Sequence, residues 1–157
     1  MKDANRNGLE LEGDTERWMK TREVNYTSQY NTSIVEPGFK KQLRVDFYVV
    51  PNALDPFYIH CKTQDVNGSV EEKMGYLMHD CIPILDHPSV IIVSGEQCDR
   101  LLGYIEKVQD RCGSKFRAAF TRDNMSANLK RLIFTGGELV PFKKLKKPDE
   151  QMPMDWG

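Results

Sequence analysis

The sequence predicts a mixed α/β domain in which helices pack on one small mixed sheet. Segments with helical spacing of apolar residues alternate along the chain with segments rich in β-branched and aromatic residues. Residues 89–94 (SVIIVS) are almost wholly apolar and follow a helical segment, as expected for a strand covered on both faces. The 157 residues suit a single domain, which we expect over residues 8–140 after a flexible start at residues 1–7.

A helix, a strand, a turn and two further strands are expected in the first half of the chain. The helix should cover residues 8–21, and residues 24–35 are β-prone but polar, as in an outer strand. Glu36-Pro37-Gly38 is typical of a turn. Residues 43–50 and 57–63 are strongly β-prone and are joined by turn-forming residues, so they predict adjacent strands.

The second half begins with a helix start signal. Ser69 and Glu72 have the spacing of a capping box, which predicts a helix from Ser69 to about Cys81. After the strand at residues 89–94, apolar residues recur with helical spacing over residues 98–111. Two later segments, KFRAAF and LKRLIF, fit either a helix or a strand.

Composition indicates a protein of the cytoplasm. No apolar run approaches the length of a membrane helix, and the amino terminus lacks the apolar middle of a signal peptide. The four cysteines form no CxxC pair, so a zinc ribbon is not supported and reduced thiols are expected.

Charge is distributed unevenly. Residues 107–147 contain 11 Lys and Arg against 3 Asp and Glu, a net charge of +8, so the rest of the chain carries −9. Such a basic region fits a polyanion-binding face, and it equally fits a solvated helix followed by a basic tail. The tail, residues 141–157, passes from basic to acidic, which fits either a partner-binding segment or terminal disorder.

The strands at residues 43–50 and 57–63 predict a polar face inside the sheet. In a hairpin, residues whose numbers sum to about 106 to 108 would pair, and alternation decides which side chains share a face. One face should hold apolar side chains: Val45, Phe47, Val49, Ile59 and Cys61. The other should hold Asp46, Tyr58, His60, Lys62 and Gln64.

Asp46 and Lys62 would both be costly on half-buried strands. Each loses hydration worth several kcal/mol, which either pairing or a metal ion must offset. A cross-strand salt bridge between the two side chains is therefore one interpretation, and a cation site is the other.

The residues around this hairpin resemble the PD-(D/E)XK nuclease superfamily. That superfamily places an Asp on one strand and an acid-x-Lys triplet on the next, as Asp46 and the triplet His60-Cys61-Lys62 do here. In the phage and restriction-type branch, Lys-x-Gln and then Gly-Ser-x-x-Glu-Lys follow, matching residues 62–64 and 68–73. The resemblance covers roughly residues 40–110 and implies a restriction-endonuclease-like αβββαβ core.

The resemblance also implies a function, a metal-dependent endonuclease that hydrolyses DNA and is encoded by a phage or mobile element. Mg²⁺ or Mn²⁺ would bind Asp46, the carbonyl of Cys61 and residue 60. Lys62 would orient the attacking water and stabilise charge on phosphorus, and Gln64 would position water or phosphate. An acid of the first helix often completes such sites, and the candidates are Glu12, Glu16 and Glu10.

His60 stands where the superfamily has Glu or Asp, which leaves three interpretations. His60 ligates the metal directly, which suits Mn²⁺ or a later metal better than Mg²⁺. A carboxylate instead reaches in from the next helix, with Glu71 and Glu72 as candidates. The third interpretation is a disabled centre on a protein that still binds nucleic acid.

The resemblance to nucleases also implies binding partners. DNA phosphates would be contacted by basic residues: Lys73, Lys115, Arg117, Arg122, Lys130 and Arg131. Cutting both strands of a duplex with one site per chain would favour a two-fold homodimer. A different hypothesis is a phage structural or adaptor protein that binds a protein partner through residues 141–157.

Overall fold

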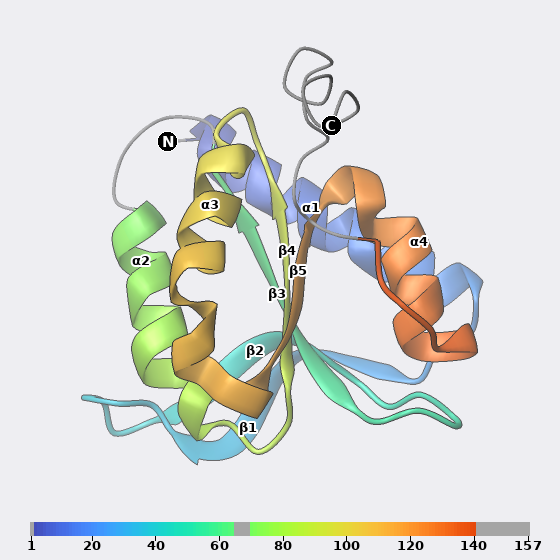
Figure 1. Ribbon diagram of the computed structural model, residues 1–157, viewed down its shortest axis with the longest axis horizontal. Coiled ribbons are helices and arrows are strands. Elements are labelled where there is room, and N and C mark those ends of the chain that lie inside the picture. Colours follow the sequence, from blue (N-terminus) through green and yellow to red (C-terminus); the bar gives the residue numbers. More distant parts are fainter. Residues whose placement is uncertain (1, 65–69, 141–157) are drawn as a thin grey trace, which may run out of the picture.

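The computed structural model describes residues 2–64 and 70–140 and forms a five-stranded mixed sheet with helices on both faces (Figure 1). The strands lie in chain order, with β1–β2 and β2–β3 antiparallel and β3–β4 and β4–β5 parallel. The strands are β1 (Tyr26–Val35), β2 (Gln42–Val49), β3 (Phe57–Thr63), β4 (Ser89–Ser94) and β5 (Phe116–Thr121). The α-helices are α1 (Lys2–Thr21), α2 (Val70–Tyr76), α3 (Cys98–Val108) and α4 (Met125–Lys130).

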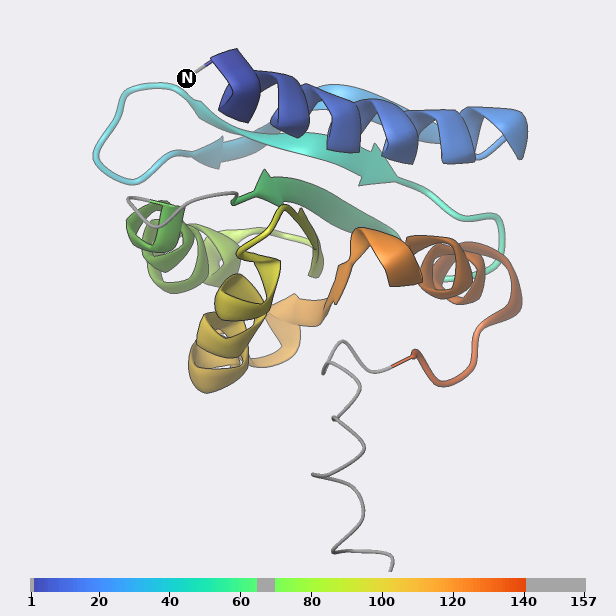
Figure 2. The same cartoon turned by 90° about the horizontal axis from the view of Figure 1, so that it is seen from above.

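The sheet separates two apolar cores, so the predicted α/β class is confirmed. On one face α1 and α4 pack on the sheet through side chains such as Leu11, Met19 and Leu129. On the other face α2 and α3 pack through Met74 and Leu102 among others. Figure 2 shows α1 on one side of the sheet, with α2 and α3 on the opposite side.

Most element boundaries agree with the sequence prediction. The strands β3 and β4 have the expected bounds, and β1 is an outer strand as predicted. The helix α1 begins at Lys2, earlier than expected, and α2 ends at Tyr76, where a π-helical turn continues to Cys81. Of the two ambiguous segments, KFRAAF folds as β5, and LKRLIF covers the end of α4 and most of the π-helical turn Arg131–Thr135. Ser69 of the capping box lies outside the described residues.

The strands β2 and β3 pair over only part of their length. The pairs run from Val49↔Phe57 to Phe47↔Ile59, so their numbers sum to 106, as predicted. Beyond this point β2 pairs with β1 alone, and β3 pairs with β4 alone. The two strands therefore diverge beyond Phe47 and Ile59, and a gap opens between them.

The divergence corrects one predicted face. Phe47 and Val49 share a core with Ile59 and Cys61, as expected from alternation. Val45 was expected with them, but it packs in the core on the α2 side of the sheet. Strands twist, and the residues of β2 that precede Phe47 are not held in register by β3.

Two further expectations concern the whole chain. Among the described residues no helix is long and apolar enough to cross a membrane. The four cysteines all lie in the described part of the chain and form no disulfide.

Candidate active site

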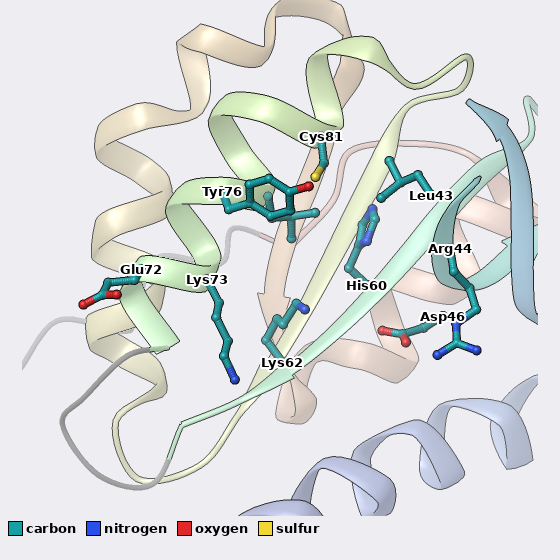
Figure 3. A pocket seen from close by; sticks show the side chains of 10 residues that line it. Leu43, Arg44, Asp46, His60, Lys62, Glu72, Lys73, Tyr76 and Cys81 are labelled. Atoms are coloured by element: carbon teal, nitrogen blue, oxygen red, sulfur yellow. The ribbon is translucent and has the colours of Figure 1, made fainter. Parts of the chain in front are cut away.

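A pocket of about 500 Å³ lies between the diverging strands and α2 (Figure 3). It brings together Asp46, His60 and Lys62, the three side chains that alternation placed on one face. The residues that line it come from β2, β3, α2 and the π-helical turn: Leu43, Arg44, Asp46, His60, Lys62, Glu72, Lys73, Tyr76, Leu77 and Cys81.

Asp46 is the first residue of β2 beyond its last pair with β3. Its carboxylate Oδ2 accepts a hydrogen bond from the backbone N–H of Cys61 at 2.7 Å, in place of a strand partner. The N–H and C=O of one strand residue point to the same side, so the Cys61 carbonyl also faces this gap. Burial raises the pKa of Asp46, although the Cys61 hydrogen bond and the positive charges of Lys62 and Arg44 oppose the shift.

The lysine of the triplet makes no close ion pair with this carboxylate. Within residues 2–64 and 70–140, no ion pair of 4.0 Å or less joins Asp46 to Lys62. Figure 3 shows the Lys62 side chain extending into the pocket. The simple salt-bridge interpretation therefore does not account for the cost of placing these two charges here.

A second carboxylate acts on the same charges from α1. Burial raises the pKa of Glu12, and the negative charge of Asp46 raises it further, whereas the positive charge of Lys62 lowers it. Its Oε1 accepts a hydrogen bond from Gln29 Nε2 at 3.0 Å, which fixes the side chain. Of the other two candidates on this helix, Glu16 accepts a hydrogen bond from the Tyr26 hydroxyl and Glu10 is exposed. Glu12 is thus the α1 acid that is electrostatically coupled to the pocket.

His60 is buried and neutral. Only 5% of the residue is exposed, and its Nε2 lies 2.9 Å from the hydroxyl oxygen of the fully buried Ser89. Burial, and after it the positive charge of Lys62, lowers the pKa of His60 from 6.5 to about 3. The ring is therefore held toward β4 by a structural hydrogen bond, which leaves Nδ1 as its other ligand atom.

His60 makes folding stability depend on pH. Its pKa is lowered in the folded chain, so the unfolded chain binds a proton first as the pH falls from 6.5 toward about 3. We expect the free energy of unfolding to fall by up to about 1.4 kcal/mol per pH unit in this window from His60 alone. Urea unfolding of His60→Gln should show a weaker pH dependence than the wild type, and equal slopes would contradict this.

The oxygen donors of the site suit a hard divalent cation. In the described part of the chain no group of three His, Cys, Asp or Glu side chains is placed to hold a metal. However, Mg²⁺ keeps several waters and is often bound by only one or two carboxylates. At the gap the oxygen donors are the Asp46 carboxylate and the Cys61 carbonyl, and Glu12, which does not line the pocket, interacts with the Asp46 charge from α1.

Of the two acids expected from α2, only Glu72 has a described side chain, and it does not add to this set. Glu72 is exposed and lies at the edge of the pocket, and Figure 3 shows its carboxylate pointing away from the pocket. The side chain of Glu71 lies outside the described residues. Gln64 is buried, with 1% exposed, and does not line the pocket.

The basic residues divide into two groups. Lys73 lines the pocket and points toward its opening beside Lys62 (Figure 3). The five basic residues of the carboxy-terminal third do not line the pocket: Lys115, Arg117, Arg122, Lys130 and Arg131. Of these, Arg122 forms an ion pair with Asp14 of α1.

Arg44 is a pocket residue that the sequence analysis missed. It lies two residues before Asp46 on β2, and Figure 3 shows its guanidinium beside the Asp46 carboxylate. Strand alternation places residues i and i+2 on one face, so the tripeptide RVD already contained this signal.

Comparison with known proteins gives one match. The family model for a PD-(D/E)XK nuclease superfamily domain matches residues 4–133, most of the 157-residue chain. The matched range includes most of α1, all five strands and every residue that lines the pocket. No curated protein and no solved structure matches the chain.

Proposed function

The chain belongs to the PD-(D/E)XK nuclease superfamily, and from this premise we propose that it is a metal-dependent endonuclease that hydrolyses DNA phosphodiester bonds. One observation carries the proposal. Where β2 and β3 diverge, the Asp46 carboxylate is held against the Cys61 backbone while Lys62 extends into the same pocket, and no close ion pair joins these two described side chains. Superfamily membership supports nuclease chemistry, and this geometry supports a site for it.

The residues have separate tasks. Asp46, Glu12 and the Cys61 carbonyl would hold Mg²⁺ or Mn²⁺, the cations to which oxygen donors are suited. The bound cation supplies activation of water and neutralisation of the charge that builds on the phosphate. The Cys61 N–H keeps the Asp46 carboxylate oriented toward the gap, so the site is organised before substrate binds.

Lys62 and its cationic neighbours act on the phosphate. Lys62 donates hydrogen bonds to the attacking water and to a phosphate oxygen whose negative charge grows in the transition state. Arg44 and Lys73, which line the same pocket, bind phosphate oxygens of the strand that is cut. Phosphodiester hydrolysis needs water activation, charge neutralisation and positioning, and the pocket has residues for each.

A plasmid assay tests the proposal. The wild-type protein is incubated with supercoiled DNA in Mg²⁺, in Mn²⁺ or in EDTA, beside a Lys62→Ala variant. We expect nicked or linear DNA from the wild type with either cation, and none in EDTA. If the wild type and Lys62→Ala cut equally, the activity does not come from this site and the proposal fails.

A second candidate function is a nucleic-acid-binding relative that does not cut. The observation that favours it is the position of His60, where the superfamily has an acid, buried against Ser89 with a low pKa. Such a chain would bind DNA in a salt-dependent way but would lack the acid of the triplet as a ligand for the cation.

His60→Glu separates the two functions. If the wild type does not cut, this change supplies the missing carboxylate, and we expect Mg²⁺-dependent cutting to appear. If the wild type already cuts, we expect tighter cation binding with a smaller change in rate, since the site was already competent. His60→Gln is the matched control because it adds no charge. Circular dichroism checks that each variant is folded.

Two proposals about assembly accompany the nuclease function. Cutting both strands of a duplex with one site per chain favours a two-fold homodimer on DNA. The partner-binding tail, residues 141–157, lies outside the described residues, and it remains a prediction that its removal abolishes a protein contact.

A further inference from the structure

The connection between β1 and β2 is a tight, well-defined hairpin. The backbone N–H of Phe39 donates to the Glu36 carbonyl at 3.0 Å, which closes a four-residue turn. Pro37 occupies its second position and Gly38, with φ of 78°, its third, the arrangement of a type II turn. A further bond from Glu36 N–H to the Lys41 carbonyl, 2.8 Å, closes the loop behind it. The turn predicted at residues 36–38 is therefore confirmed, and its conformation is fixed before any partner binds.

The hairpin is anchored beside the pocket. The Tyr76 hydroxyl of α2 lies 2.9 Å from Glu36 Oε2 and 3.0 Å from the Pro37 carbonyl. Tyr76 itself lines the pocket, so one side chain connects the pocket wall to the hairpin. Figures 1 and 2 both show the turn between β1 and β2 extending at the same end of the molecule as α2.

The tip carries an aromatic side chain among lysines. Phe39 is 54% exposed, and the apolar Val35 beside the turn is 60% exposed. The Lys41 Nζ lies 5.4 Å from the centroid of the Phe39 ring and 3.9 Å from Glu36, and Lys40 next to it is exposed. Phe39 and Val35 therefore form a small exposed apolar surface on a hydrogen-bonded turn, bordered by lysine side chains, where a partner has access to them.

The charges indicate which partner. Lys40 and Lys41 stand at the turn, Arg44 follows on the same strand, and Arg44 shares the pocket with Lys62 and Lys73. A path of cations therefore leads from the hairpin into the candidate active site. Such a path fits a polyanion that enters the pocket and continues past the hairpin.

We propose that this hairpin binds duplex DNA beside the bond that is cut, with Phe39 against the bases in a groove and Lys40 and Lys41 on the flanking phosphates. A duplex groove admits a two-stranded β-ribbon, and exposed Phe side chains insert between base steps. The inference rests on the proposed nuclease function and adds a substrate-binding element outside the pocket.

The length of the strand limits where this contact falls. Seven residues separate Phe39 from Asp46, which is at most about 23 Å at roughly 3.3 Å per residue. Along one DNA strand, at roughly 3.4 Å per nucleotide, this distance corresponds to about seven base pairs or fewer. A duplex that extends fewer than about seven base pairs from the cut on the hairpin side should therefore lose the contribution of the hairpin to binding.

Fluorescence anisotropy with a labelled short duplex in EDTA tests the contact without cutting, over a series of salt concentrations. The variants are Phe39→Ala, Phe39→Trp and Lys40→Ala/Lys41→Ala. The control is Lys20→Ala, which removes an exposed lysine charge at the end of α1 that does not line the pocket. Single-stranded DNA of the same sequence is a parallel arm.

Each change has its own expected result. Lys40→Ala/Lys41→Ala should reduce the slope of log affinity against log salt by about 1.8, since each phosphate contact contributes about 0.9. Phe39→Ala should weaken duplex binding about tenfold with no change in slope, and Phe39→Trp should retain it. The control variant should bind as the wild type does.

Other outcomes overturn the inference in distinguishable ways. If the hairpin variants bind duplex as the wild type does while Lys62→Ala still abolishes cutting, the hairpin contact is wrong and the nuclease function stands. If Phe39→Ala changes the molecular mass in solution but not DNA binding, the tip joins copies of this chain. If only single strands are bound through Phe39, the duplex assignment is wrong. If the wild type neither binds nor cuts DNA, the proposed function itself fails.

Discussion

Replacing Lys62 with alanine is expected to lower the rate of DNA cutting by about 10²- to 10³-fold, the usual effect of losing one donor to charge that develops in the transition state. Lys62 extends into the pocket, and in the part of the chain that the structure describes no close ion pair joins it to Asp46. The folded chain should lose little stability, because no such pair is broken. Single-turnover rates with excess enzyme measure the chemical step directly.

The matched control for this change is Lys73→Ala. It removes the same side chain from the same pocket, but from α2 rather than from β3. We expect it to weaken DNA binding at low salt with a much smaller effect on the single-turnover rate. If Lys62→Ala and Lys73→Ala reduced the chemical step equally, Lys62 would be only one of several phosphate contacts.

Replacing Asp46 with asparagine is expected to reduce cutting by at least about 10²-fold while leaving the chain as stable as the wild type or more stable. Asparagine keeps an oxygen that can accept the Cys61 hydrogen bond of 2.7 Å but removes the negative charge that a cation needs. Loss of activity without loss of stability is the pattern expected of a residue retained for function rather than for folding.

The stability part of this prediction follows from the pKa. Burial raises the pKa of Asp46 in the folded chain above its ordinary value of 3.8. Folding therefore favours the protonated form, and stability is lost as the pH rises from below 3.8 through the raised pKa. Urea unfolding at low and at neutral pH measures the free energy of unfolding of the wild type and of Asp46→Asn. A clear loss of stability in the variant at neutral pH would show that the charged carboxylate stabilises the fold.

The sequence predicted the part of the site that depends on strand alternation. Residues 57–63 and 89–94 have strong β propensity and almost continuous burial, so β3 and β4 were found with the bounds that the structure has. The hairpin register then placed Asp46, His60 and Lys62 on one face, and all three line the pocket. Period-two alternation is a local property, which is why it can be read from sequence.

Other features depend on long-range packing and were not predictable. The divergence of β2 from β3 moves Val45 into the core on the α2 side, which no local pattern indicates. Among the acids of α1, only the tertiary structure distinguishes Glu12, coupled to Asp46, from Glu16, which binds Tyr26. The position of the β1–β2 hairpin beside the pocket also comes from the fold, through the Tyr76 hydroxyl of α2.

Binding of Mn²⁺ to the folded protein, measured by electron paramagnetic resonance or calorimetry in the absence of DNA, tests most directly whether Asp46 organises a cation site. Wild-type protein and Lys62→Ala should both bind the ion, because the lysine is not a ligand, whereas Asp46→Asn should bind it at least about tenfold more weakly. Equal Mn²⁺ affinity in wild type and Asp46→Asn would contradict the cation site at the divergence of β2 and β3.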